Sequence, residues 1–265
     1  MSEHRMPAAA PTPRDPHWGV GTASVGVLLA LLGVWALGAL TRTVVMSGPA
    51  ALVLSYAVVW VPLMAVALWA CFARGTGSLV RDFGLRFTWL DLLWGVGLGL
   101  VLRAIATIVE IAVYGGLQGN LSFGEPANDF WWLFGGLLAP VLIAPFIEEV
   151  YFRGLMQRAL TRATARLTGS GADAAADDNA LVPPTRTGFV PRIPWLAVVV
   201  TSIVFSLLHV ATTSLLIWQS AVVVGVATLI FGLAVGVLTA LTGRIGGAII
   251  AHVVYNGMLV LVLGM

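Results

Sequence analysis

A chain of 265 residues would ordinarily suggest one or two soluble domains. The composition excludes them, because hydrophobic residues make up 59% of the sequence and charged residues only 10%, against about 25% in a typical soluble protein. Most of the surface must therefore meet lipid. The net charge of +2 comes from arginines spread between apolar spans, so the sequence predicts no binding of nucleic acid. The single cysteine, Cys71, excludes a disulfide scaffold.

The N-terminal residues 1–17 are rich in proline and alanine and carry charges of both signs. They contain no apolar core of a signal peptide, and the apolar run that follows, 18–40, is longer than the roughly 7–15 residues of such a core. We therefore predict a disordered cytoplasmic tail over 1–17, followed by a transmembrane helix that the protein retains.

Several apolar stretches are long enough to cross a bilayer, which takes about 20 helical residues. Neither a repeat of fixed period nor the alternating pattern of a membrane β-barrel accompanies them. The sequence predicts an all-α fold, a polytopic integral membrane protein with about seven transmembrane helices. These helices form a single transmembrane domain over 18–265. The predicted spans are about 18–40, 50–72, 91–115, 131–157, 193–211, 214–241 and 245–264.

Arginines mark alternate connections between these spans. The tail and the second, fourth and sixth loops carry two, three, five and one arginines, whereas the first loop carries only Arg42 and the third and fifth loops carry none. The positive-inside rule then places the N-terminus in the cytoplasm and the C-terminus outside. The polar segment 168–192 is predicted to be a flexible cytoplasmic loop. All the basic residues are arginine, a bias typical of GC-rich bacterial genes, so the predicted location is a bacterial plasma membrane.

Ionisable residues inside transmembrane helices are functional candidates, because a charge in the membrane costs free energy. Arg103 and Glu110 share one face of the third span but lie about 10 Å apart along its axis. The sequence leaves open a structural charge pair, a partner on another helix and a catalytic role. Asp91, at the entrance of the same span, is predicted to be an N-cap.

Two adjacent glutamates occur in the fourth span, after Pro140 and Pro145, which are expected to kink the helix. Glu149 and Arg153 are four residues apart and can pair on one helix face. Glu148 is rotated by about 100° from Glu149 and faces another direction. We therefore expect the arginine to fix Glu149, while Glu148 stays free for chemistry.

Two histidines lie in the later spans, each with a companion four residues away on the same helix face. They are His209 with Phe205, and His252 with Asn256. Counting about 1.5 Å per residue along the helices brings these groups and Glu148 to broadly similar depth, with His209 fitting least well. A single histidine on an apolar helix is more often a core residue than a functional one. The prediction of a functional site therefore depends on several polar groups lying at similar depth.

A carboxylate, two imidazoles and an amide suit hydrolysis by an activated water. Glu148 can act as a general base, and His209 can orient the water or bind a metal. His252 and Asn256 can polarise a carbonyl or stabilise an oxyanion. Glu148, His209 and His252 are also a hydrolytic zinc set, although HExxH is absent. Zinc and direct activation without a metal remain alternatives.

The motifs EExxxR from Glu148, FxxxH from Phe205 and HxxxN from His252 occur in the order typical of CPBP intramembrane proteases. Over about 130–260, the motif-bearing core, the sequence resembles this family, which includes CAAX prenyl endopeptidases and bacterial Abi-type proteins. The resemblance implies a catalytic glutamate with a histidine partner, and an HxxxN pair that stabilises the transition state. The implied catalytic residues are Glu148, His209, His252 and Asn256, and the supporting residues are Glu149, Arg153 and Phe205.

The function that follows is an intramembrane endopeptidase. The expected substrate is a membrane-associated peptide or protein tail that enters from the membrane or the cytoplasmic side, and the expected surroundings are a lipid bilayer. The sequence indicates neither the cleavage site nor the oligomeric state. One alternative is a non-catalytic scaffold or immunity protein of the same family, which predicts the loss of a motif residue, yet all are present. The other is a proton-coupled transporter, which predicts inverted repeats that we do not find.

Overall fold

The computed structural model describes residues 16–116, 130–168, 193–213 and 217–263, and the regular structure in these ranges is helical. The predicted tail over 1–17 and the predicted loop over 168–192 fall almost entirely outside them. The elements are α1 (Val20–Leu40), α2 (Gly48–Arg74), α3 (Leu79–Phe83), α4 (Trp89–Tyr114), α5 (Phe130–Trp132), η1 (Leu133–Ile143), α6 (Ala144–Glu149), η2 (Val150–Met156), α7 (Gln157–Leu167), α8 (Trp195–Ala211), α9 (Trp218–Thr242) and α10 (Gly246–Leu263).

The prediction of an all-α polytopic membrane protein is confirmed. Within the described ranges, five helical stretches are long and apolar enough to cross a membrane. Two shorter apolar helices, Trp195–Ala211 and Gly246–Val260, occupy the places of the fifth and seventh predicted spans. The long stretches are Val20–Leu40, Gly48–Arg74, Trp89–Tyr114, Phe130–Leu167 and Trp218–Thr242.

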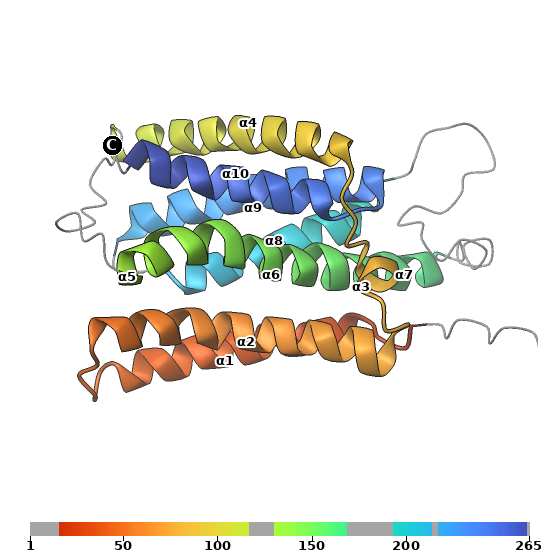
Figure 1. The fold of residues 1–265 in the computed structure, drawn as a ribbon, viewed down its shortest axis with the longest axis horizontal. Coiled ribbons are helices and arrows are strands. Elements are labelled where there is room, and N and C mark those ends of the chain that lie inside the picture. The colour runs from red at the N-terminus through yellow and green to blue at the C-terminus, as the bar shows by residue number, and fades with distance from the viewer. Residues whose placement is uncertain (1–15, 117–129, 169–192, 214–216, 264–265) are drawn as a thin grey trace, which may run out of the picture.

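The helices run roughly along one direction, as Figure 1 shows, with α1 and α2 forming a hairpin beside the remaining bundle. In that bundle α4 packs on α10 and α8 packs on α9, while α6 lies between the hairpin and α10. Many of the side chains on these helices are apolar and exposed, including Trp35, Trp94 and Leu207. Such an apolar exterior is what a lipid environment requires.

Arginine-bearing segments meet at one end of the bundle, which we call the arginine end. The Arg158 guanidinium donates to the Gly243 carbonyl at 2.8 Å, and Arg244 forms a salt bridge with Asp91 at 3.0 Å. Asp91 is not the N-cap that the sequence predicted. Thr88 occupies that position, and Asp91 accepts a 2.7 Å hydrogen bond from the Thr88 backbone N–H, because an acidic residue three positions on closes a capping box.

The fourth span is longer than predicted. Helical structure continues from Phe130 to Leu167, whereas the sequence predicted an end near residue 157. The extension, α7, is polar but has partners: the Gln157 side chain donates to the Gly236 carbonyl at 2.9 Å and the Thr161 hydroxyl donates to the Gln157 carbonyl at 2.8 Å. Hydropathy underestimates a helix whose polar side chains are satisfied by packing.

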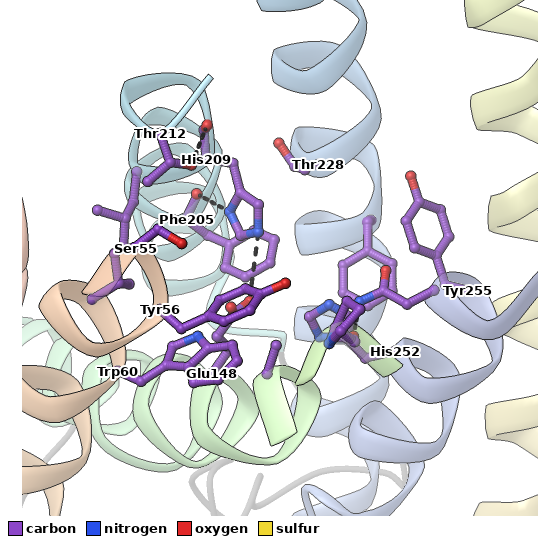
Figure 2. A pocket seen from close by; sticks show the side chains of 16 residues that line it. Ser55, Tyr56, Trp60, Glu148, Phe205, His209, Thr212, Thr228, His252 and Tyr255 are labelled. Atoms are coloured by element: carbon purple, nitrogen blue, oxygen red, sulfur yellow. Dashed lines mark hydrogen bonds and ion pairs between the residues drawn. The ribbon is translucent and has the colours of Figure 1, made fainter. Parts of the chain in front are cut away.

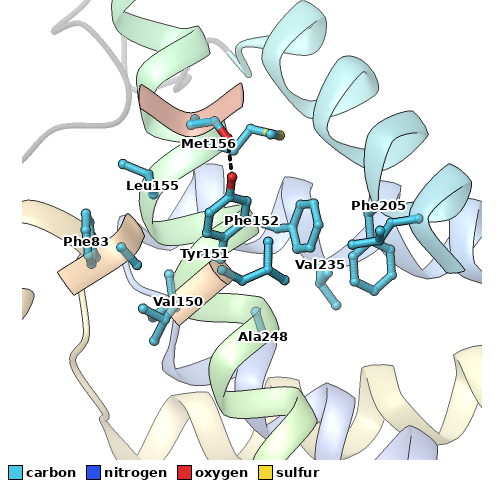
Figure 3. Close-up of a cluster of buried hydrophobic side chains, with 14 of the residues drawn as sticks. Phe83, Val150, Tyr151, Phe152, Leu155, Met156, Phe205, Val235 and Ala248 are labelled. Carbon is cyan, nitrogen blue, oxygen red and sulfur yellow. Dashed lines mark hydrogen bonds between the residues drawn. The ribbon is translucent and has the colours of Figure 1, made fainter. Parts of the chain in front are cut away.

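Tyr151 and Phe152, which follow the two glutamates, lie in the hydrophobic core (Figure 3). Phe152 meets Phe205 edge to face, with ring centroids 5.1 Å apart. Tyr151 turns toward α1, where its hydroxyl donates to the Ala23 carbonyl and accepts from the Val27 N–H. Gly26 gives this ring its space, since a Cβ there would lie 2.5 Å from the hydroxyl. The hairpin is thus anchored to the motif-bearing helix.

Replacement of Gly26 by leucine should therefore loosen the hairpin. We expect Gly26→Leu to lower the free energy of unfolding by about 1–3 kcal/mol, the usual cost of overpacking, measured as thermal denaturation in detergent. Gly38→Leu is the matched control, because nothing lies within 4 Å of a Cβ at that position. Equal stability of the two variants would contradict the anchoring role of Tyr151.

Candidate active site

Glu149 is the centre of a fully buried charge cluster. Its Oε1 accepts from Arg153 Nη1 at 3.2 Å and lies 2.9 Å from His252 Nδ1. Arg153 Nη2 also donates to the Gly232 carbonyl at 3.3 Å. Neither Glu149 nor Arg153 has any exposed surface. The predicted pairing of these two residues is therefore present, and the cluster also connects the fourth span to α9 and α10.

Aromatic rings enclose this cluster. The Arg153 guanidinium carbon lies 4.6 Å from the ring centroid of Phe205 and 5.9 Å from that of Phe231. The His252 ring lies 4.6 Å from Phe231. The rings exclude water and attract the cation through their faces, so FxxxH supplies a packing surface for the arginine as well as a histidine.

Glu148 faces in a different direction, as the helical rotation between adjacent residues requires. Its Oε2 lies 3.5 Å from Nε2 of His209, with no hydrogen-bond partner among the described residues. Figure 2 shows this pair at a cavity, with His252 on the far side. The structure thus brings together the carboxylate and the histidine that the sequence placed on separate helices.

The hydrogen bond at the other nitrogen of His209 defines its tautomer. Nδ1 lies 2.9 Å from the Phe205 carbonyl oxygen, four residues earlier. A carbonyl can only accept, so Nδ1 carries the hydrogen. In the neutral ring, Nε2 then presents its lone pair toward Glu148. Two proton acceptors therefore face each other across 3.5 Å.

Asn256 owes its orientation to the backbone of the fourth span. In a π-helix the N–H of residue i bonds to the carbonyl of residue i−5, so prolines at 140 and 145 leave the carbonyls of Gly135 and Pro140 without that partner. The Asn256 side-chain amide donates to the Pro140 oxygen at 2.7 Å, and the Tyr56 hydroxyl donates to the Gly135 oxygen at 2.9 Å.

These side chains line a cavity of about 380 Å³. The cavity is mostly apolar and aromatic, with the polar groups of the three motifs on its wall. The lining residues are Ser55, Tyr56, Val59, Trp60, Pro140, Ala144, Glu148, Phe205, Leu208, His209, Thr212, Thr228, Phe231, His252, Tyr255 and Asn256. Glu148, His209, His252 and Asn256 all border one partly open space that is large enough to hold part of a peptide.

Sequence reasoning missed two features of this site. The contact between His252 and Glu149 joins two motifs, and no spacing in the sequence indicates it. The contribution of α2, through Tyr56 and Trp60, comes from a helix without a motif. The sequence signal that could have indicated this wall is the aromatic pair Tyr56 and Trp60, four residues apart and next to Ser55.

A zinc site over Glu148, His209 and His252 is not supported by the donor arrangement. Among the described residues, no group of three or more His, Cys, Asp or Glu side chains is placed to hold a metal ion. No step below is therefore assigned to a metal.

Arg103 and Glu110 pair with each other, which is the structural charge pair among the alternatives left open by the sequence. Their closest atoms are 3.5 Å apart, since the long side chains cover the two turns between them. The Arg103 guanidinium carbon also lies 5.1 Å from the ring centroid of Tyr255, which lines the cavity. The pair therefore supports α10 from behind and does not line the cavity.

The fold and the site define a polytopic membrane protein with a buried carboxylate and imidazole at an internal cavity. Residues 130–258, the part that carries all three motifs, match the type II CAAX prenyl endopeptidase Rce1-like family, so this part of the chain is an Rce1-like family domain. Neither a curated protein sequence nor a solved structure matches the chain significantly. Membership of this family implies an intramembrane protease, and the predicted CPBP resemblance is confirmed.

The two adjacent glutamates should differ sharply in their effect on stability. We expect Glu149→Gln to lower the free energy of unfolding by about 3–5 kcal/mol, because it leaves the buried Arg153 without its counter-charge. Glu148→Gln should change it far less, since no cation pairs with Glu148 permanently. Thermal and denaturant unfolding in detergent measure both. Equal losses would show that the two carboxylates have equivalent surroundings.

Proposed function

We propose that this protein is an intramembrane endopeptidase in which Glu148 and His209 activate a water molecule directly. The observation that carries the proposal is the 3.5 Å approach of Glu148 Oε2 to His209 Nε2 on the wall of a cavity. Both atoms are acceptors when the carboxylate is ionised and the ring neutral. In the proposed reaction the two side chains move apart to admit a water, which donates one hydrogen to each and keeps a lone pair for attack.

The reaction then follows from the positions of these acceptors. The water oxygen attacks the peptide carbonyl carbon while Glu148 takes a proton, so a C–O bond forms and the carbonyl π electrons move to the oxygen. Glu148 returns that proton to the amide nitrogen as the C–N bond breaks, which releases a carboxylic acid and an amine. His209, fixed by its bond to Phe205, keeps the water oriented throughout.

The transition-state oxyanion requires donors, and the HxxxN pair supplies them in this proposal. Asn256 Nδ2 uses one hydrogen on the Pro140 carbonyl, which leaves its second N–H for the cavity. His252, whose Nδ1 lies 2.9 Å from the Glu149 carboxylate, is held on the same cavity wall as Asn256. Preorganised donors of this kind lower a barrier because they need no reorientation during the reaction.

Loss of either member of the activating pair should abolish cleavage. We expect Glu148→Gln and His209→Ala to lower kcat/KM by about 10²–10⁴-fold, and Asn256→Ala to lower kcat by about 10²–10³-fold. The measurement is cleavage of a quenched peptide library by purified protein in detergent, with and without a zinc chelator.

Glu110→Gln is the matched control, since it makes the same chemical change in a paired carboxylate that does not line the cavity. Cleavage by the Glu148→Gln variant at the wild-type rate would overturn the proposal. Cleavage that the chelator removes would replace direct activation by metal chemistry. A folded wild-type protein that cleaves nothing would favour a scaffold or immunity role.

We also propose an orientation and a substrate class. The arginine end is assigned to the cytoplasm, which puts the N-terminus inside and the C-terminus outside. The substrate is a membrane-associated peptide or protein tail. This assignment is supported by the segregation of Arg158, Arg244 and their partners at one end of the bundle.

Cysteine labelling tests this orientation. Cys71 is buried and is the only cysteine, so Cys71→Ala provides a background for single replacements. On intact cells, we expect an impermeant maleimide to label Thr43→Cys, in the α1–α2 connection, and to reach Thr168→Cys, at the end of α7, only after permeabilisation. The opposite pattern would invert the proposed topology.

A further inference from the structure

One wall of the cavity comes from α2, which lies outside the residues that match the family. Tyr56, Val59 and Trp60 share a helix face there, and Ser55 extends it. Figure 2 shows this face opposite His252, with Tyr56 and Trp60 next to the catalytic carboxylate. A peptide whose carbonyl carbon approaches the activated water must therefore place a neighbouring side chain against α2.

The aromatic pair on this wall is rigid. The rings of Tyr56 and Trp60 stack with centroids 4.4 Å apart and planes 10° apart. The Tyr56 hydroxyl bonds to the Gly135 carbonyl, on the same continuous helix that carries Glu148. This hydrogen bond fixes the α2 wall relative to Glu148. A surface that selects substrates by shape needs such a fixed position.

The charge of the cavity restricts what can bind there. Of the sixteen lining residues, Glu148 is the only acidic one, and none is arginine or lysine. A carboxylate from the substrate would lie in this apolar space without a cation, which costs free energy. An ammonium group would pair with Glu148 and remove its ability to accept a proton. An uncharged apolar side chain meets neither penalty.

The most exposed part of the cavity lining lies on α2 and directly after α8. Ser55 and Thr212 are the most exposed of the lining residues. Ser55 is seven residues from the first residue of α2, and Thr212 follows the last residue of α8, so both lie away from the arginine end. A segment that enters here passes Ser55 before it reaches Trp60.

We propose that α2 determines specificity: its Tyr56–Trp60 face receives an uncharged apolar side chain adjacent to the scissile bond of a peptide segment that enters between Ser55 and Thr212. The reference to a scissile bond rests on the proposed protease function. Binding of the apolar segment can be tested separately.

The first test compares cleavage preferences. Trp60→Ala enlarges the space beside Glu148, so peptides with Trp or Phe next to the cut should gain about tenfold in kcat/KM over peptides with Val. Tyr56→Phe keeps the stacked ring but loses the bond to Gly135, and should raise KM with little change in kcat. Val61→Ala is the matched control, because Val61 is an exposed α2 residue that does not line the cavity.

The second test measures binding without turnover. Ser55→Cys in the Cys71→Ala, Glu148→Gln protein is labelled with a maleimide in detergent. An uncharged leucine-rich decapeptide should slow the labelling severalfold, whereas the same peptide with a central Asp should not. A Ser24→Cys protein, whose cysteine lies on α1 away from the lining residues, should be labelled equally with either peptide.

The outcomes separate this inference from the protease function. A wild-type protein that cleaves peptides, with Trp60→Ala retaining the same preference, overturns the specificity role of α2 and leaves the protease intact. A wild-type protein that cleaves nothing contradicts the protease function, and the labelling result then decides whether the apolar segment binds. Labelling of Ser55→Cys that no peptide slows, or that both peptides slow equally, overturns the inference.

Discussion

The rest of the site depends on the burial of the Glu149 charge. An ionised carboxylate away from water is tolerated only with partners, and Glu149 obtains them from its own helix through Arg153 and from α10 through His252. Arg153 in turn needs the Gly232 carbonyl on α9. One carboxylate therefore fixes three helices relative to one another. It also determines that the adjacent glutamate faces the cavity, because neighbouring helical residues cannot share a direction.

The prolines of the fourth span act through the hydrogen bonds that they remove. Each proline lacks an N–H, so it cannot donate a π-helical hydrogen bond to the carbonyl five residues earlier. In a membrane such a carbonyl must find another donor, and here the donors are the side chains of Asn256 and Tyr56. A local sequence feature thus orients an amide at the site from α10 and attaches α2 to the motif-bearing helix.

Hydropathy and helical spacing predicted the spans and the Glu149–Arg153 pair, because both depend on residues close in sequence. The same reasoning could not predict the contact of His252 with Glu149, which depends on how α6 and α10 pack. It also missed the wall formed by Trp60, since an aromatic residue on an apolar helix has the same pattern whether it faces lipid or a cavity. Spacing also left open whether Arg103 pairs with Glu110, because the axial separation of about 10 Å is crossed only by the reach of the two long side chains.

A hydrolase inside a membrane must keep one ionised group dry and expose another to water, although the two are adjacent in sequence. Phe205 and Phe231 keep Glu149 away from water by packing on Arg153 and His252. The Glu149 charge is therefore neutralised by protein groups and not by water. Glu148, which is also buried, has no paired arginine and faces a cavity whose other polar groups lie on other helices. The cluster of Glu149, Arg153 and His252 also holds His252 at the cavity wall. A substitution that destabilises this cluster therefore also displaces a proposed oxyanion donor. Substitutions in the cluster should therefore be judged by folding first, and by activity only where the fold survives.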